Sequence, residues 1–111
     1  KMAELVCEYH THCHRAAELR PSTMLDVLEA LDVFRRPQRL DGFLLACEAD
    51  ARGRLGFENS VYPQATIFRD CFDAASTVDI SDLVKSGKTG QEIQQQLRIR
   101  RTDKISRVIG R

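Results

Sequence analysis

Apolar residues recur every three or four positions through most of this chain, and prolines and glycines interrupt the pattern at intervals. This spacing gathers apolar side chains on one face of an α-helix, whereas a half-buried strand requires alternation with a period of two. The sequence contains no sustained alternation and no internal repeat. The pattern therefore predicts an all-α fold with about five main helices.

The first three helices are expected between clear stop points. We expect one helix over residues 2–19, and a second that begins at Pro21 and continues until the segment 35–37 stops it. A third helix should run from Pro37 to about Gly53. Residues 54–61 then form the longest stretch without helical periodicity.

The second half of the chain carries equally explicit boundaries. Pro63 should open a fourth helix, and Asp79 can cap a short helix that Gly87 terminates. The pair Thr89 and Glu92 has the spacing of a capping box, which predicts the start of a last helix.

Composition limits the class of protein. At 111 residues, with 42% hydrophobic residues, five Phe, two Tyr and no Trp, one domain with an aliphatic core is expected. No apolar run is long enough to span a membrane, and no signal segment opens the chain. The four cysteines form no C-x-x-C pair, so buried free thiols in a reducing cytoplasm are expected. A chain that starts at Lys1 favours a piece of a longer protein.

Charge is distributed unevenly along the sequence. Residues 1–84 carry nine basic and fourteen acidic side chains, a net charge of −5, whereas residues 85–111 carry eight basic and two acidic ones, a net charge of +6. A basic tail on an acidic body indicates an anionic partner, with RNA as the first choice. The alternative is that the tail is only a solvated helix face.

The residues around Asp50 pose a specific chemical question. In helical steps, Asp50 falls on the same stripe as Leu40, Cys47 and Arg54, so its carboxylate should face the interior. A buried carboxylate is costly unless a cation, a metal or hydrogen-bond donors meet it. The partner is either Arg54, one turn later, or a metal or phosphate site shared with another helix.

A group of histidines and cysteines lies in the first predicted helix. Cys7, His10 and His14 fall within one stripe, and histidines four residues apart can bind a metal from one helix. His12 and Cys13 are close in sequence. The alternative for His10 is a histidine at the edge of the core whose ring is satisfied by a backbone carbonyl.

Several segments together resemble a known family. These are Glu-Tyr-His at 8–10, Leu-Asp-Val-Phe-Arg-Arg-Pro-Gln-Arg at 31–39, Glu-Ala-Asp-x-Arg-Gly-Arg-x-Gly-Phe-Glu at 48–58, Tyr-Pro-Gln at 62–64 and the Gly87-x-x-Gly90-x-x-Ile93-x-x-x-Leu97 pattern. In residue identity, order and approximate spacing, these segments resemble bacterial tRNA nucleotidyltransferases, the CCA-adding enzymes, of the type that carries an HD phosphohydrolase domain. The resemblance covers almost the whole of this chain, but only the C-terminal part of the proteins in that family.

The resemblance implies a division of the chain and an activity for the intact enzyme. Residues 1–78 would be the C-terminal part of the HD domain, and residues 79–111 basic tail helices that contact tRNA. The intact enzyme would add C, C and A to tRNA 3′ ends from CTP and ATP with Mg²⁺. Its HD domain would hydrolyse 2′,3′-cyclic phosphates and 2′-phosphates with a transition metal such as Ni²⁺.

The resemblance also implies an incomplete site in this chain. His10 matches a histidine of the hydrolase site, where it would be a metal ligand with a catalytic role, and Asp50 matches a late metal-binding aspartate. No His-Asp dipeptide and no Asp-x-Asp pair occur in the 111 residues. The chain alone is therefore expected to be inactive, with no cofactor of its own, and to serve as a structural and RNA-binding piece.

The expected RNA-binding residues are basic side chains near helix ends and along the last helix. They are Arg35, Arg36, Arg39, Arg52, Arg54, Lys85, Lys88, Arg98, Arg100, Arg101 and Lys104. Contacts of this kind position RNA through its phosphates and carry little sequence information. Two other interpretations stay open, a stand-alone helical module that binds RNA or protein, and a self-contained metal-binding bundle.

Overall fold

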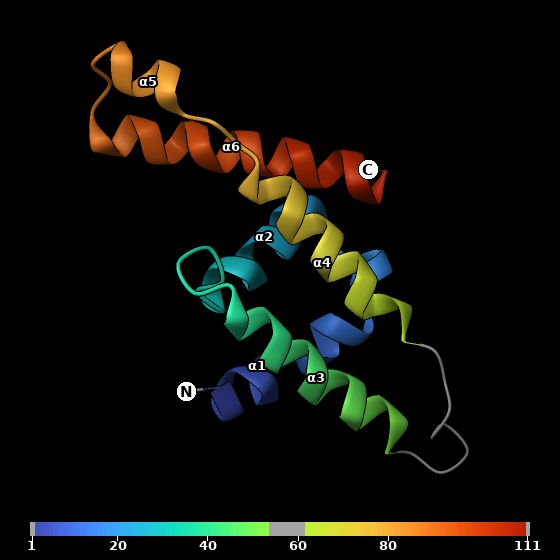
Figure 1. Ribbon diagram of the computed structural model, residues 1–111. Helices are drawn as coiled ribbons and strands as arrows, with labels where there is room; N and C mark the ends of the chain where they lie inside the picture. The colour runs from blue at the N-terminus through green and yellow to red at the C-terminus, as the bar shows by residue number, and fades with distance from the viewer. Residues whose placement is uncertain (1, 54–61, 111) are drawn as a thin grey trace.

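The computed structural model describes residues 2–53 and 62–110, and these residues form helices and turns without any strand. The elements are α1 (Met2–His14), the 3-10 helix η1 (Ala16–Glu18), α2 (Pro21–Ala30), α3 (Gln38–Arg52), α4 (Pro63–Ser76), α5 (Ser81–Lys85) and α6 (Gly90–Ile109), as Figure 1 shows. Five of the helices have between 10 and 20 residues. The all-α prediction with about five main helices is confirmed.

Two predicted helices end earlier than the apolar pattern indicated. α1 stops at His14, where Arg15 departs from helical geometry at φ −106° and ψ 24°, and η1 takes up three residues of the remainder. Arg20, directly before Pro21, is extended at φ −71° and ψ 151°, as the residue before a proline prefers. α2 stops at Ala30, before the expected limit, since Asp32 adopts a positive φ of 61°. Aspartate is one of the few residues besides glycine that tolerates this conformation.

The boundary of α6 agrees with the expected cap, whereas the N-cap position of α5 is Ile80, which makes no side-chain cap, and Asp79 lies one residue before it. Asp79 Oδ1 accepts a hydrogen bond from the Ser81 backbone N–H at 2.9 Å at the start of α5. Gly87, with φ 76°, turns the chain out of α5. At the start of α6, Thr89 and Glu92 make both hydrogen bonds of the capping box, at 3.2 and 3.0 Å.

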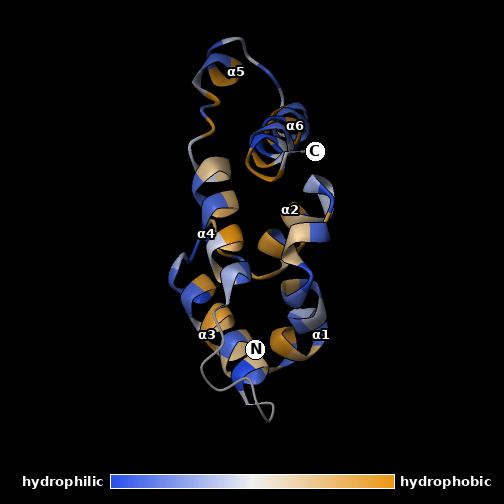
Figure 2. Ribbon diagram, turned by 90° about the vertical axis from the view of Figure 1, so that its right-hand side faces the viewer, coloured by the Kyte–Doolittle hydropathy of each residue, from blue (hydrophilic) through white to orange (hydrophobic). Residues whose placement is uncertain are grey.

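The helices form an elongated body of 56 × 31 × 18 Å. α1 and α3 pack together at one end, and α6 lies across α2 and α4 at the other (Figure 1). Seen from the side, the apolar faces of α2 and α4 turn toward each other beneath the end-on α6 (Figure 2). No described helix is long and apolar enough to cross a membrane.

The core is continuous from α1 to α6. Phe43 of α3 and Phe68 of α4 lie with ring centroids 6.0 Å apart, among fully buried aliphatic residues of α2 such as Met24 and Leu28. Ile105 of α6 is fully buried in the same cluster. The division into residues 1–78 and 79–111 stays a prediction, and the described core extends across that boundary through Ile105.

Candidate functional site

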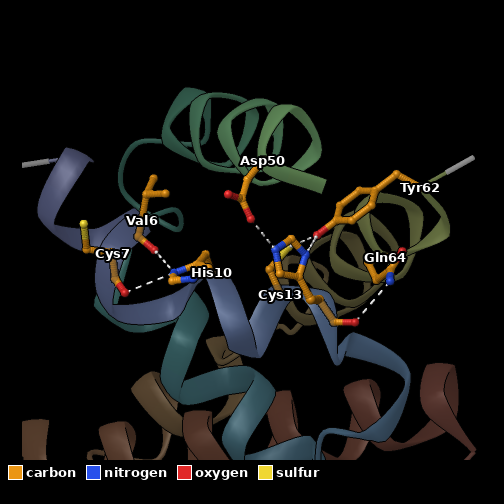
Figure 3. Close-up of polar contacts among 8 residues, drawn as sticks. Val6, Cys7, His10, Cys13, Asp50, Tyr62 and Gln64 are labelled. Atoms are coloured by element: carbon orange, nitrogen blue, oxygen red, sulfur yellow. Dashed lines mark hydrogen bonds and ion pairs between the residues drawn. The ribbon is translucent and has the colours of Figure 1, made fainter. Parts of the chain in front are cut away.

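The ends of three helices meet at the imidazole of His14, the unlabelled ring that dashed lines join to Asp50 and Tyr62 in Figure 3. His14, the last residue of α1, places Nε2 2.9 Å from Asp50 Oδ2 near the end of α3. Its Nδ1 lies 2.8 Å from the hydroxyl of Tyr62, directly before α4. Gln64 donates from Nε2 to the His14 carbonyl at 3.1 Å. The ring therefore joins α1, α3 and α4 through polar contacts at the rim of the core.

The hydrogen bonds continue from His14 into the core. Tyr62 Oη is 3.2 Å from the Sγ of buried Cys13. Burial, and then the hydrogen bond with Cys13, raise the pKa of the Tyr62 hydroxyl, so it stays protonated at neutral pH. Since an ionised Asp50 only accepts, Nε2 of His14 carries a proton. The Tyr62 hydroxyl has a single proton. When it donates that proton to Cys13 Sγ, its oxygen can only accept from Nδ1 of a doubly protonated His14 ring, and when it donates to the Nδ1 of a neutral ring, it can only accept from the Cys13 thiol.

His10 lies one turn before His14 on the same face of α1. Its Nδ1 is 3.0 Å from the Val6 carbonyl and 3.1 Å from the Cys7 carbonyl, and the two histidine rings are edge to face with centroids 5.9 Å apart. The two carbonyl contacts agree with the alternative expectation for His10, a histidine at the edge of the core whose ring is satisfied by a backbone carbonyl. An Nδ1–H that donates to a carbonyl leaves Nε2 as the nitrogen with a lone pair, which is the usual arrangement of a metal-binding histidine.

Asp50 does not face the interior as its helical stripe indicated. Its side chain is 50% exposed, whereas Cys47, one turn earlier on the same stripe, is fully buried. The stripe reaches the rim of the molecule in the last turn of α3, so the carboxylate meets the half-buried His14 there. The expected Asp50–Arg54 pair involves residue 54, which lies outside the described residues.

The contact between His14 and Asp50 was missed by sequence reasoning. The sequence places His14 on one stripe with Cys7 and His10 and Tyr62 in the Tyr-Pro-Gln segment, but it relates neither residue to Asp50. Among residues 2–53 and 62–110, no three His, Cys, Asp or Glu side chains converge on a position that a metal could occupy. His10 and Asp50 each approach His14, and the described residues do not supply the rest of a metal shell.

The cysteines follow their helix faces. Cys13, Cys47 and Cys71 are buried and free, as expected, but Cys7 is exposed, so the expectation of burial was wrong for this residue. Its position on α1 faces away from the core. The hydrogen bond from the Cys47 thiol, and secondarily that from Tyr62, lower the pKa of Cys13.

Several of the expected RNA-binding arginines have partners within the protein. Arg98 of α6 binds Glu29 Oε1 at 2.7 Å and Asp26 Oδ1 at 2.6 Å, both on α2. Arg100 binds both oxygens of Asp82 on α5 at 2.9 and 2.8 Å. Two more are engaged locally: Arg39 Nε donates to the Leu31 carbonyl at 2.6 Å, and Arg52 pairs with Glu48 at 2.8 Å.

Arg101 is held by an aromatic ring. Its guanidinium carbon lies 3.8 Å from the centroid of the Phe34 ring, which in turn packs against Phe72 of α4. Its Nε atom is buried without a hydrogen-bond partner in the described part of the chain. Burial lowers the pKa of the guanidinium, and nearby Glu29 opposes that effect. Arg101 is thus mainly a packing residue between α6 and the turn after α2.

The remaining expected residues are more accessible. Arg36, Lys85 and Lys88 are exposed, and Lys104 is half-buried. Arg35 is 75% exposed and approaches Asp32 only at 3.9 Å. Lys104 borders a shallow hollow of about 490 Å³ between α6 and the segment after α4. Arg54 lies outside the described residues.

Comparison with known proteins gives one consistent result. The chain is 54% identical over 103 residues to a multifunctional CCA protein of Actinobacillus pleuropneumoniae, 51% over 98 residues to one of Pseudomonas savastanoi, and 44% over 107 residues to one of Hahella chejuensis. These matches include 93, 88 and 96% of this chain but only 25, 24 and 25% of the relatives. The chain thus spans about a quarter of their length. No family model and no solved structure matches it.

Proposed function

We propose, because this chain is homologous to part of the multifunctional CCA proteins, that it is the C-terminal, tRNA-holding part of a CCA-adding tRNA nucleotidyltransferase. The observation that carries the proposal is the 54% identity over 93% of the chain. The family resemblance of the segments at 8–10, 31–39 and 48–58 agrees with it. An enzyme that works on tRNA would act in the cytoplasm.

The proposed partner of this part is the phosphate backbone of tRNA. The net charge of +6 over residues 85–111 supplies the attraction. Proteins that bind single strands stack bases on accessible aromatic rings. The aromatic side chains of residues 2–53 and 62–110 are all buried or half-buried, which favours contacts to phosphates over contacts to bases.

The nucleotidyl transfer itself would take place elsewhere in the full-length protein. That reaction uses two metal-bound carboxylates, CTP, ATP and Mg²⁺, and this chain contains no Asp-x-Asp pair. The role of residues 1–111 would be to hold the tRNA while another domain adds nucleotides. We therefore expect no nucleotide incorporation by the chain alone.

A second proposed activity of the full-length protein is hydrolysis at the HD domain. His10 would bind a transition metal through Nε2, with Nδ1 directed to the Val6 carbonyl at 3.0 Å, and Asp50 would be a further ligand. When bound, the metal would activate water for attack on a phosphate ester. The His-Asp pair of that site would come from residues that precede this chain in the full-length protein. His14 would hold Asp50 through the contact between Nε2 and Oδ2.

Titration of a tRNA transcript that lacks its 3′ CCA tests the proposal. We expect the 111-residue chain to bind weakly, to lose affinity steeply as salt rises, and to incorporate neither CTP nor ATP. Binding that does not respond to salt, or no binding, would count against an RNA-holding role. The rival interpretation of a stand-alone module predicts a native reading frame that starts near Lys1, whereas our proposal predicts about three further chain lengths upstream, in line with the 25% coverage.

A further inference from the structure

The basic residues of α6 differ in what their charged groups touch. We infer that Arg98 and Arg100 are positioning residues that fix the α5–α6 turn, and that Lys85 and Lys88 on this turn contact the RNA phosphates. The inference rests on the proposed function and assigns two different roles to cations that charge alone does not distinguish.

Arg98 fastens α6 to α2. Its Nη1 donates to Glu29 at 2.7 Å, and its Nη2 donates to Asp26 at 2.6 Å and reaches the Ser22 carbonyl at 3.4 Å. Two carboxylates neutralise the single guanidinium charge. A phosphate would have to displace both of them, so Arg98 is a poor first contact for RNA.

Arg100 fastens α6 to α5. It makes a two-pronged contact with the Asp82 carboxylate, and its Nη1 also donates to the Asp79 carbonyl at 2.8 Å. Such paired N–H···O bonds fix an orientation as well as a distance. Because Asp79 itself accepts from the Ser81 backbone at 2.9 Å, the start of α5 is bound both to α6 and to the Asp79 side chain that precedes it.

The α5–α6 turn carries two cations that, unlike Arg98 and Arg100, have no carboxylate partner in the described segments. Lys85 and Lys88 are exposed, and neither forms an ion pair with any carboxylate in the described segments. Lys88 interacts with Glu92 only through longer-range electrostatic attraction. The Glu92 carboxylate accepts a hydrogen bond from the Thr89 N–H at 3.0 Å. Ammonium groups without a close anion can meet a phosphate without first losing a protein partner.

The geometry of the turn explains why fixing it would matter. The start of α6 lies about 12–15 Å along the helix axis from Arg98 and Arg100, at a rise of about 1.5 Å per residue. α5 and this end of α6 project beyond α2 and α4 (Figure 1). Only Leu83 of α5 is buried, at 7% exposure, so apolar packing of α5 is slight and the Arg100 contact supplies much of its attachment.

Two sets of variants of the 111-residue chain test this inference by titration with a tRNA transcript. Lys85→Gln with Lys88→Gln should reduce the slope of log affinity against log salt by about 1.4–1.8, since each lost phosphate contact removes about 0.7–0.9. The control, Arg15→Gln with Arg69→Gln, removes two exposed cations elsewhere, each paired with a carboxylate (Glu18 and Asp41), and should leave a larger slope. Equal slopes for the two double variants would overturn the inference.

Asp82→Asn separates positioning from direct contact. It leaves every cation in place but weakens the hold on Arg100, because the amide offers one acceptor oxygen and no charge in place of the carboxylate that now takes two hydrogen bonds. If Arg100 positions the turn, the variant binds tRNA more weakly than the control Asp70→Asn, which removes the same charge from an exposed site on α4. If Arg100 contacts phosphate directly, its release strengthens binding beyond that control, and the inference is wrong.

Folding and the underlying proposal are checked in the same series. Circular dichroism of each variant shows whether the helices persist, and the variants at the exposed Lys85 and Lys88 keep the test valid if the Asp82 variant unfolds. If the unchanged chain fails to bind tRNA, the proposed function fails and the inference with it. If the unchanged chain binds and only the variant pattern differs, the assignment of contacts alone is overturned.

Discussion

Nε2 of His14 lies 2.9 Å from Oδ2 of Asp50, although 36 residues separate them in sequence. The other ring nitrogen reaches the Tyr62 hydroxyl at 2.8 Å, so one imidazole joins three helices. The three partners differ in exposure: Tyr62 is 8% exposed, the His14 side chain 20% and the Asp50 side chain 50%. Because an unpaired polar group costs more the deeper it is buried, the Tyr62 side of the contact should dominate its stability.

Replacement of His14 by Ala should lower the free energy of unfolding by about 1–3 kcal/mol, since it leaves the buried Tyr62 hydroxyl without its imidazole partner. Asp50→Asn should cost less than about 1 kcal/mol, because the amide oxygen still accepts from Nε2 and the site is half exposed. Urea denaturation at neutral pH measures both values. A cost for Asp50→Asn equal to that for His14→Ala would show that the charge of Asp50 is the main contribution.

The helices could be predicted from sequence because their determinants are local. The capping box of Thr89 and Glu92, and the start of α4 at Pro63, depend on residues within one turn. The early end of α2 was not predicted, since the apolar residues continue past Ala30 while Asp32 turns the backbone at φ 61°. A hydrophobic stripe reports which side faces the core and gives little information on backbone conformation at its end.

The site was less predictable because its contacts are long-range. The helical stripe of Asp50 indicated an interior position, but whether the last turn of a helix is covered depends on the length of its neighbours. The partner, His14, comes from a different helix. In the same way, Arg98 and Arg100 read as part of a basic tail, and only the fold brings Asp26, Glu29 and Asp82 to them.

Arg101→Met should change the free energy of unfolding by less than about 1 kcal/mol. The variant loses the cation–π contact with Phe34, worth about 0.5–1 kcal/mol at a partly exposed site. It also removes the buried Nε that lacks a partner, and it keeps an unbranched side chain for packing. Thermal unfolding with Arg101→Ala as the packing control measures the balance. A large loss for Met would mean that the guanidinium has an essential partner.

The four thiols should differ sharply in reactivity toward a maleimide. Cys7 is exposed, whereas Cys13, Cys47 and Cys71 are fully buried. Burial raises the pKa of Cys71 to about 12, so it has almost no thiolate at pH 7. Mass spectrometry of the native chain should show one fast modification at Cys7, and four after unfolding in urea. Rapid labelling of Cys71 without denaturant would contradict the described packing of α4.

The attachment of α5 to α6 should weaken in acid. Hydrogen bonds from Arg100 lower the pKa of Asp82 from 3.8 to about 2. A carboxyl with a depressed folded-state pKa stabilises fully above its unfolded pKa, and this contribution is lost as pH falls from 3.8 to about 2. The wild-type chain should therefore exceed Asp82→Asn in melting temperature at pH 7, and the difference should disappear by about pH 2. A difference independent of pH would rule out this ion pair as its cause.

Ile105 provides the test of whether α6 is an integral part of the body. Its side chain is fully buried with residues of the other helices, so Ile105→Ala should remove about 2–5 kcal/mol from the free energy of unfolding through lost burial and a residual cavity. Ile99, on the same helix, is 59% exposed, and Ile99→Ala should cost less than about 1 kcal/mol while changing helix propensity equally. Urea unfolding of both variants, monitored by far-ultraviolet circular dichroism, gives the comparison.

If Ile105→Ala loosens only α6, the unfolding transition splits into two phases and residues 79–111 behave as a separate tail. A single cooperative transition shifted to lower urea means that α6 unfolds together with the helices it crosses, so that a chain ending at residue 78 would expose the core that Ile105 covers.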